Sequence, residues 1–263
     1  MKLKKLVLNI TKAAFKGFGL EVFPKRRGYA YQLQSETPAF FGKSAHKLMD
    51  IRLLPVFGPL ADTVIQHNRT YLYYDRLFTL FHMIRNLTQN IQPDEKVNFA
   101  EVGVHRGGGS YFIASSAKAL GLKNMSLHSF DTFEGHAEED IHPDLDSAHK
   151  PGSFGNVDFD DVKKYLSAFD NIKAHKGRFQ ETSAQVSNEK FHFVHLDVDI
   201  YEPTAFGLEF FDRHLVKRGI IVVDDYGFAS CPGAKKAIDE FIETHTEYFS
   251  FPLLTGQFLL IKY

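Results

Sequence analysis

The stretch FHFVHLDVDIYEPTAFGLEFFDRHLVKRGIIVVDDYG (residues 191–227) decides the fold. It contains two short, unbroken apolar runs, Phe193–Leu196 and Ile220–Val223, whose composition is that of parallel strands covered on both faces. The segment between them carries apolar residues at helical spacing (Leu208, Phe211 and Leu215), and we expect Gly219 to end this helix. A strand–helix–strand unit is right-handed and parallel, so both strands end at the same edge of a sheet.

Four aspartates follow these two strands. Asp197 and Asp199 come after the first run, and Asp224 and Asp225 come after the second. Open α/β sheets bind ligands at this edge, and carboxylates packed there repel one another unless a cation lies among them. A single aspartate in such a place often only caps the next helix. For Asp197 together with Asp224 and Asp225, the pattern favours a metal ion or a cationic ligand.

The composition is that of an ordinary globular protein. The chain has 263 residues, 44% hydrophobic and 24% charged, which suits one large α/β domain with an N-terminal extension. The net charge of −1 gives no reason to expect a nucleic-acid partner. The one cysteine, Cys231, excludes an internal disulfide and fits a reducing cytoplasm. No apolar run is long enough to span a membrane, and polar residues interrupt the basic N-terminal segment, so we do not expect secretion.

The N-terminal segment, residues 1–30, is basic and has the apolar spacing of an amphipathic helix. Such a helix can lie on an anionic membrane surface, or it can pack on the domain or on a second subunit, and the pattern favours neither. We assign residues 1–68 to an N-terminal extension and residues 69–263 to the main domain. The expected location is the cytoplasm, with membrane association through the basic N-terminus as an alternative.

Strands and helices alternate through the main domain. We expect helices over 70–87, 110–120 and 162–169 and from Pro232, strands over 97–102, 125–130 and 172–175, and a terminal β-hairpin of 248–254 with 258–263. The loop 132–157 is long and acidic and carries His136, His142 and His149. A loop of this length in a compact domain is typical of a lid or a binding loop.

The first strand leads into a glycine-rich turn, and residues 101–110 read E-x-G-x-x-x-G-G-G-S. This order suggests an adenosine-containing ligand, and Asp131 ends the next strand, where an acidic residue accepts hydrogen bonds from ribose hydroxyls. The dinucleotide fingerprint would need glycine at His105. Glu101, which can balance a cationic ligand, and the terminal hairpin favour S-adenosylmethionine over a nicotinamide. We therefore expect a Rossmann-like class I methyltransferase fold, with a mostly parallel seven-stranded sheet ending in an antiparallel hairpin and helices on both faces.

Four segments resemble the macrocin O-methyltransferase family, whose members methylate sugar hydroxyls on macrolides and related antibiotics. They are AEVGVHRGG (100–108), DTFEG (131–135), LDVDIYEPT (196–204) and VDDYG (223–227). The resemblance implies a sugar-containing small molecule or a glycan as the acceptor. Family members build acceptor and oligomer contacts from their N-terminal regions, so it also implies a homo-oligomer.

The same resemblance implies two cofactors, S-adenosylmethionine and Mg²⁺. It places the metal on Asp197, Asp224 and Asp225. It places the cosubstrate among residues of the first two strands and their turns, with an aromatic and an amide side chain beside the adenine: Glu101, Gly103, Gly107, Ser110, Asp131, Phe179 and Gln180.

An alcohol hydroxyl is a poor nucleophile at neutral pH, so the expected reaction needs a metal and a base. We expect Asp197 to act through the metal and His149 to act as the general base, with His142 as the second candidate. One alternative keeps the fold and the metal but takes a catechol-type acceptor. Another is a non-catalytic module that binds an adenosine ligand or a membrane surface. The acidic, histidine-bearing lid favours a polar acceptor over a catechol, and the intact set of three aspartates argues against a non-catalytic module. A third alternative, a nicotinamide oxidoreductase, is disfavoured by the missing glycine at position 105 and by the terminal hairpin.

Overall fold

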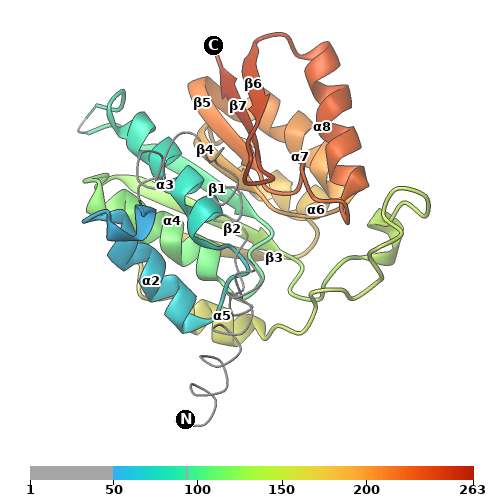
Figure 1. Cartoon of the computed structure of the whole chain (residues 1–263), viewed down its shortest axis with the longest axis horizontal. Helices are drawn as coiled ribbons and strands as arrows, with labels where there is room; N and C mark the ends of the chain where they lie inside the picture. The colour runs from blue at the N-terminus through green and yellow to red at the C-terminus, as the bar shows by residue number, and fades with distance from the viewer. Residues whose placement is uncertain (1–49, 93) are drawn as a thin grey trace, which may run out of the picture. The chain divides into compact units, whose positions relative to one another are not determined.

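A computed structural model describes residues 50–92 and 94–263. Its centre is one seven-stranded sheet (Figure 1) with the strand order β3-β2-β1-β4-β5-β7-β6. The strands are β1 (Val97–Val102), β2 (Met125–Asp131), β3 (Ile172–Lys176), β4 (Phe191–Leu196), β5 (Leu215–Val223), β6 (Tyr248–Pro252) and β7 (Phe258–Lys262). Strands β1 to β5 are parallel, and β7 is antiparallel to both β5 and β6. This confirms the predicted class I methyltransferase fold.

Helices cover both faces of the sheet. They are α2 (Phe57–His67), α3 (Tyr74–Thr88), α4 (Gly108–Ala119), α5 (Phe159–Leu166), α6 (Phe179–Thr182), α7 (Tyr201–His214) and α8 (Pro232–Thr244), with short 3₁₀ helices η3 (Ile51–Leu53), η4 (Glu138–Asp140) and η5 (Ser183–Val186). Figure 1 shows α2, α3 and α4 on one side of the sheet and α7 and α8 on the other. Two buried clusters follow this division: α2, α3 and α4 form one with the strands, and α6, α7 and α8 form the other.

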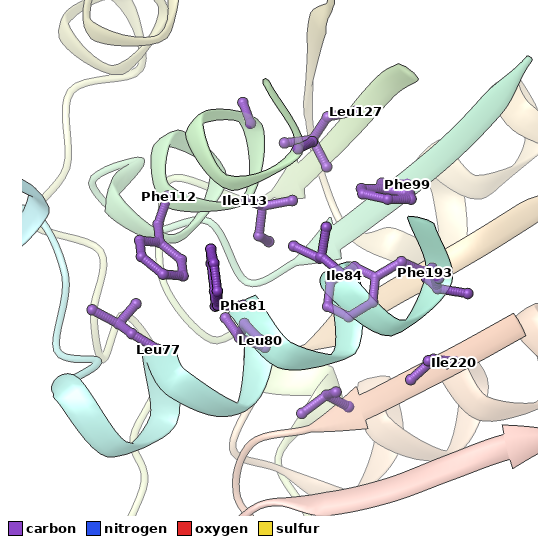
Figure 2. Close-up of a cluster of buried hydrophobic side chains, with 14 of the residues drawn as sticks. Leu77, Leu80, Phe81, Ile84, Phe99, Phe112, Ile113, Leu127, Phe193 and Ile220 are labelled. Carbon is purple, nitrogen blue, oxygen red and sulfur yellow. The ribbon is translucent and has the colours of Figure 1, made fainter. Parts of the chain in front are cut away.

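The alternation of side chains along a strand assigns each strand residue to one cluster. In β1, Phe99 belongs to the cluster of α3 and α4, while Ala100 belongs to that of α7 and α8. Figure 2 shows the first cluster, where Ile84 and its neighbours on α3 face α4 and the strand residues Phe99 and Phe193. Each fully buried side chain of this size contributes roughly 1.5–3 kcal/mol. This packing fixes α3 against the sheet, close to the strand ends that form the site.

Several helix and strand ends differ by a few residues from the sequence-based expectation, and one glycine has a different role. Helix α3 begins at Tyr74 rather than at residue 70. Gly219, which we expected to end the helix, lies instead inside β5, because α7 already ends at His214. The β4–β5 pairing shifts register there, and a Cβ on Gly219 would lie 2.6 Å from Leu215 Cγ. Gly219 thus lies at an irregular, crowded point of β5 where a larger side chain would not fit. A glycine inside a strand pattern can indicate such an irregularity as well as a helix end.

The part of the expected N-terminal extension that the structure describes, residues 50–68, packs into the domain. Phe57, Ala61 and Val64 of α2 are buried in the cluster around α3 and α4. Residues 50–68 therefore belong to the same compact unit as the expected main domain. The amphipathic helix expected within residues 1–30 lies outside the described residues. Among the described residues, no helix has the length and apolarity needed to cross a bilayer.

Candidate active site

A cavity of about 290 Å³ lies at the carboxyl ends of the parallel strands. The glycine turn, the ends of β2, β4 and β5, the start of α6 and the loop 132–158 all contribute to its wall. Seven of the predicted site residues border it: Glu101, Gly103, Asp131, Phe179, Gln180, Asp197 and Asp225. Four others, Gly107, Ser110, His149 and Asp224, do not belong to its lining. The structure therefore brings most of the predicted residues to one cavity and leaves these four outside its lining.

The glycines of the turn allow close backbone approach. Gly103 has φ +95°, and a Cβ at this position would lie 1.7 Å from the backbone oxygen of Asp197. This contact joins the ends of β1 and β4, reinforced by the Asp197 amide, which donates to the Val102 carbonyl at 2.8 Å. Gly107 has φ +87° and precedes α4, where it packs against Tyr165 on α5. Gly103 thus shapes the cavity, whereas Gly107 sets how α4 starts.

Glu101 is buried and is already paired within the protein. It accepts a hydrogen bond from Ser110 Oγ, and His195 Nδ1 lies 3.0 Å from its Oε1. Burial lowers the pKa of His195, but the neighbouring carboxylates of Asp224 and Glu101 outweigh burial and raise this pKa to about 10. The imidazolium that results sits between two carboxylates, with His195 Nε2 3.6 Å from Asp224 Oδ1. The charge of Glu101 is therefore balanced before any cationic ligand arrives.

Asp131 borders the cavity and also holds two loops. Its carboxylate accepts hydrogen bonds from the backbone amides of His105 at 2.7 Å and Phe133 at 2.6 Å. Burial is the largest influence on this carboxyl and raises its pKa. Each carboxylate oxygen has two lone pairs, so these bonds leave capacity to accept from ribose hydroxyls. The ribose contact of Asp131 stays a prediction.

The start of α6 supplies an apolar surface and an amide to the cavity. The ring of Phe179 packs edge-on against Phe130, with centroids 5.0 Å apart. Gln180 donates from Nε2 to Asp140 Oδ1 at 2.9 Å, while its buried Oε1 has no hydrogen-bond partner among the described residues. Asp140 in turn accepts from Arg178 Nε at 3.0 Å. An aromatic ring beside an unused amide acceptor suits the adenine predicted to lie here.

Three carboxylates border the cavity close together: Asp197, Asp199 and Asp225. Burial, followed by repulsion from neighbouring carboxylates, raises the pKa of Asp197 and of Asp225 well above the usual value. The Asp199 amide donates to Asp225 Oδ2 at 3.0 Å, which fixes the turn that carries these side chains. The cavity edge thus concentrates negative charge that the protein does not fully neutralise.

Asp224 lies behind this group and is fully buried. It forms an ion pair with Arg76 of α3, and its Oδ1 accepts from Gln257 Nε2 at 2.9 Å. Burial tends to raise the pKa of Asp224, but Arg76 and His195 outweigh it and lower this pKa. Asp224 is therefore ionised and held by three partners, while Asp197 and Asp225 face the cavity.

This donor set fits a divalent cation. Mg²⁺ prefers carboxylate oxygens, and one such ion would relieve the repulsion that raises the pKa of Asp197 and of Asp225. Asp197 and Asp224 also lie close enough for one oxygen of each to reach a common ion. Of the three predicted metal ligands, Asp224 alone would have to bind the ion while it keeps its contact with Arg76.

The loop 132–158 is tied to the sheet rather than structureless. Asp146, fully buried, accepts from the Tyr201 amide at the start of α7 at 3.2 Å. His149 Nε2 lies 3.0 Å from the Ser230 carbonyl oxygen, just before α8. His142, the second candidate for the base, lies outside the cavity lining, and its Nδ1 accepts from the Asp144 amide at 3.3 Å. The loop therefore closes over the edge of the sheet, and His149 stands beside the acidic cluster.

Sequence reasoning missed several residues that organise the site. His195 occupies the same strand face as Glu101, with which it is in register, and the two-residue alternation of β4 could have indicated this. Arg76 precedes Leu80 by four residues and so shares the buried side of α3. Gln257 and Asp146 come from loops, and no local pattern indicates their contacts.

The fold and the site together define the class. A glycine turn after β1, an acidic residue ending β2 and an antiparallel β7 are the features of a class I methyltransferase, and solved structures agree. The O-methyltransferase NovP has a TM-score of 0.64 at 20% identity, covering 74% of this chain and 82% of NovP. The calicheamicin methyltransferase CalS11 has a TM-score of 0.58 at 19% identity, covering 82% and 98%. These similarities show the fold.

Residues 68–248 match the macrocin-O-methyltransferase (TylF) family, and this chain belongs to that family. A tetracenomycin-C rhamnosyl 4'-O-methyltransferase from Streptomyces olivaceus is 27% identical over 167 residues, 60% of this chain and 63% of that protein. The mycinamicin III 3''-O-methyltransferase from Micromonospora griseorubida is 24% identical over 187 residues, 67% of this chain and 71% of that protein. The chain thus matches a little under two thirds of the length of the first of these relatives.

Proposed function

We propose that this protein transfers a methyl group from S-adenosylmethionine to a hydroxyl of a sugar-containing acceptor, with Mg²⁺ as the metal. The observation that carries the proposal is the single cavity bordered by the glycine turn, Asp131 and the carboxylates Asp197, Asp199 and Asp225. Family membership supports the chemistry. Two relatives are named for O-methylation of a rhamnosyl group and of mycinamicin III, which supports a sugar acceptor.

The protein's own residues bind and orient the reactants. Asp131 would accept from the ribose hydroxyls, and Phe179 and Gln180 would flank the adenine, as their places in the cavity wall suggest. Gly103 lets the ends of β1 and β4 approach each other closely, and this approach shapes the cavity wall. Alignment of this kind lowers the barrier by fixing the reacting groups before reaction.

The acidic cluster would hold the metal. Asp197 and Asp225 supply oxygens at the cavity, and Asp224 supports them from behind while Arg76 and His195 keep it ionised. When bound, S-adenosylmethionine supplies an electrophilic methyl group, and magnesium polarises an acceptor hydroxyl. The burial of this cluster strengthens its electrostatic effect because little water screens it.

The acceptor proton needs a base within reach of the cavity. Asp199 borders the cavity, and burial raises its pKa, which makes it a stronger proton acceptor than an exposed carboxylate. His149, the base predicted from the sequence, lies outside the cavity lining and places a ring nitrogen within 4.8 Å of an Asp199 carboxylate oxygen. We propose Asp199 as the first acceptor of the proton and His149 as the next.

The experiment combines binding with turnover. Calorimetric titration with S-adenosylmethionine should show binding that an Asp131→Ala change weakens at least tenfold, since it removes the predicted ribose contact. Incubation with Mg²⁺ and a panel of rhamnosylated and other glycosylated acceptors should give a product heavier by one methyl group, detected by mass spectrometry. Absence of S-adenosylmethionine binding would refute the cofactor, whereas binding with turnover of catechols alone would refute the sugar acceptor.

A further inference from the structure

A second group of metal-ligand side chains lies beside the acidic cluster. His136, His149 and Asp199 each place one ligand atom within 4.8 Å of the other two. His136 Nε2 is 3.7 Å from Asp199 Oδ2, and it is buried with no hydrogen-bond partner among the described residues. The thiol of Cys231 adjoins the group, 3.7 Å from both His149 Nε2 and Asp199 Oδ1.

These separations are close enough for the side chains to converge on one tetrahedral ion after small movements. With zinc–nitrogen and zinc–oxygen bonds of about 2.0–2.2 Å and a zinc–sulfur bond of about 2.3 Å, neighbouring ligand atoms lie about 3.4–3.6 Å apart. Among the three proposed ligands, the 3.7 Å between His136 Nε2 and Asp199 Oδ2 needs only a small contraction, and the remaining separations, each within 4.8 Å, need a larger one. Two imidazoles with a carboxylate suit zinc and similar transition metals, whereas magnesium prefers oxygen ligands alone. The two groups of ligands therefore differ in the metal that each selects.

We propose that His136, His149 and Asp199 form a binding site for a zinc-type transition-metal ion, distinct from the magnesium site. Two ligands come from the loop 132–158 and the third from the turn after β4, so the ion fastens the loop to the sheet. His149 Nε2 lies against the Ser230 carbonyl, and its ring can bind the metal through Nδ1 while it keeps that hydrogen bond, a common arrangement around metal-bound histidines.

The site has a consequence for activity, and this part alone rests on the proposed function. An ion that holds Asp199 and His149 occupies the groups proposed to accept the acceptor proton. Zinc should therefore inhibit methyl transfer at a magnesium concentration that saturates the enzyme. The ion-binding part of the inference stands whether or not the protein is a methyltransferase.

In the test, the full-length protein is first stripped of metal with a chelator and then placed in excess Mg²⁺. Zinc chloride is titrated into this sample by calorimetry. We expect one zinc ion per chain, with an affinity that falls about 100-fold or more in His136→Ala, since even the loss of outer partners costs 10–100-fold. His149→Gln serves as an independent second variant, and circular dichroism verifies that each is folded. His142→Ala, which alters another histidine of the same loop, should bind zinc as the wild type does.

Two further readouts identify the ligands and the effect on the loop. Cobalt substitution should give the visible absorption of a tetrahedral ion, with an added thiolate band lost in Cys231→Ser if Cys231 joins the sphere. Hydrogen exchange should slow in residues 132–158 when zinc is added. Equal zinc affinity in wild type and His136→Ala, or displacement of zinc by magnesium alone, would overturn the inference. Zinc binding without inhibition would instead refute the proposed role of Asp199 and His149 in accepting the proton.

Discussion

Replacing Asp225 by asparagine should stabilise the metal-free protein. The change keeps the shape of the side chain and an oxygen that can accept from the Asp199 amide, but it removes one charge from the cluster. Carboxylate oxygens of Asp199 and Asp225 lie within 4.8 Å of each other, which corresponds to about 3.5 kcal/mol of repulsion at an effective dielectric constant of about 20. Attraction from Arg76 offsets part of this, so we expect a gain of about 1–3 kcal/mol at pH 7.

The dependence on pH gives the sign of the effect. Repulsion and burial raise the pKa of Asp225 in the folded state above the ordinary value of 3.8. A raised carboxyl pKa penalises the folded state at high pH, and the penalty shrinks as the pH falls toward 3.8, because both states then carry the proton. The advantage of Asp225→Asn should therefore be greatest near pH 7 and smaller at pH 5.

Magnesium should remove or reverse the stability advantage of Asp225→Asn. A ligand present at 100 times its dissociation constant stabilises the folded state by about 2.7 kcal/mol, and this gain needs an intact site. Urea unfolding of the wild type and the variant, in chelator and in magnesium, measures both the repulsion in the metal-free protein and the stabilisation by the metal. Asp170→Asn, at an exposed carboxylate, is the matched control and should change stability by less than about 0.5 kcal/mol. Destabilisation of Asp225→Asn in chelator at pH 7, or equal stabilisation of both proteins by magnesium, would refute carboxylate repulsion at an intact metal site.

Three further changes test the packing around the site by urea unfolding. Gly103→Ala, whose Cβ would overlap the backbone oxygen of Asp197, should lower the unfolding free energy by more than about 4 kcal/mol. Gly121→Ala, also at positive φ but in open space, should lower it by about 1 kcal/mol. Similar costs for the two variants would contradict the close approach at Gly103. Ile84→Ala, at a fully buried position in Figure 2, should cost about 2–5 kcal/mol, and a smaller cost would mean that α3 is loosely packed. Burial lowers the pKa of His128 to about 4, so the unfolded chain takes up the proton first as the pH falls below 6.5. Between pH 7 and pH 5 the wild type should therefore lose about 1–2 kcal/mol more unfolding free energy than His128→Phe. Equal losses would refute a buried neutral imidazole.

The central strands β1 and β4 were predictable because each is a short, fully buried run that helices cover on both faces of the sheet. The grouping of the aspartates was predictable because they follow parallel strands, and the carboxyl ends of parallel strands lie at one edge of the sheet. Gly219 misled because a glycine after a helical pattern indicates a helix end as readily as a strand irregularity. The local sequence contains both possibilities, and only the pairing of β5 with β4 selects one.

The partners of Asp224 were out of reach for a different reason. Arg76 is 148 residues away along the chain and Gln257 is 33 residues away, so neither contact leaves a local pattern. The same holds for Asp146, which accepts from Tyr201 at the start of α7 across 55 residues. Contacts of this kind depend on how loops cross the finished sheet, and a single sequence carries no record of that.

The alternation of the strands explains why adjacent aspartates have different roles. Phe99 and Phe193 face α3, so Glu101 and His195, two residues further along each strand, face the same side. Continuing β5 by the same rule places Asp224 with Ile220 and Val222 on that side, where Arg76 and His195 meet it, and turns Asp225 toward the cavity. One of the two carboxylates thus completes a buried network of alternating charge, and its neighbour stays available for a cation. A two-residue count from Phe193 and Ile220 is enough to predict that division.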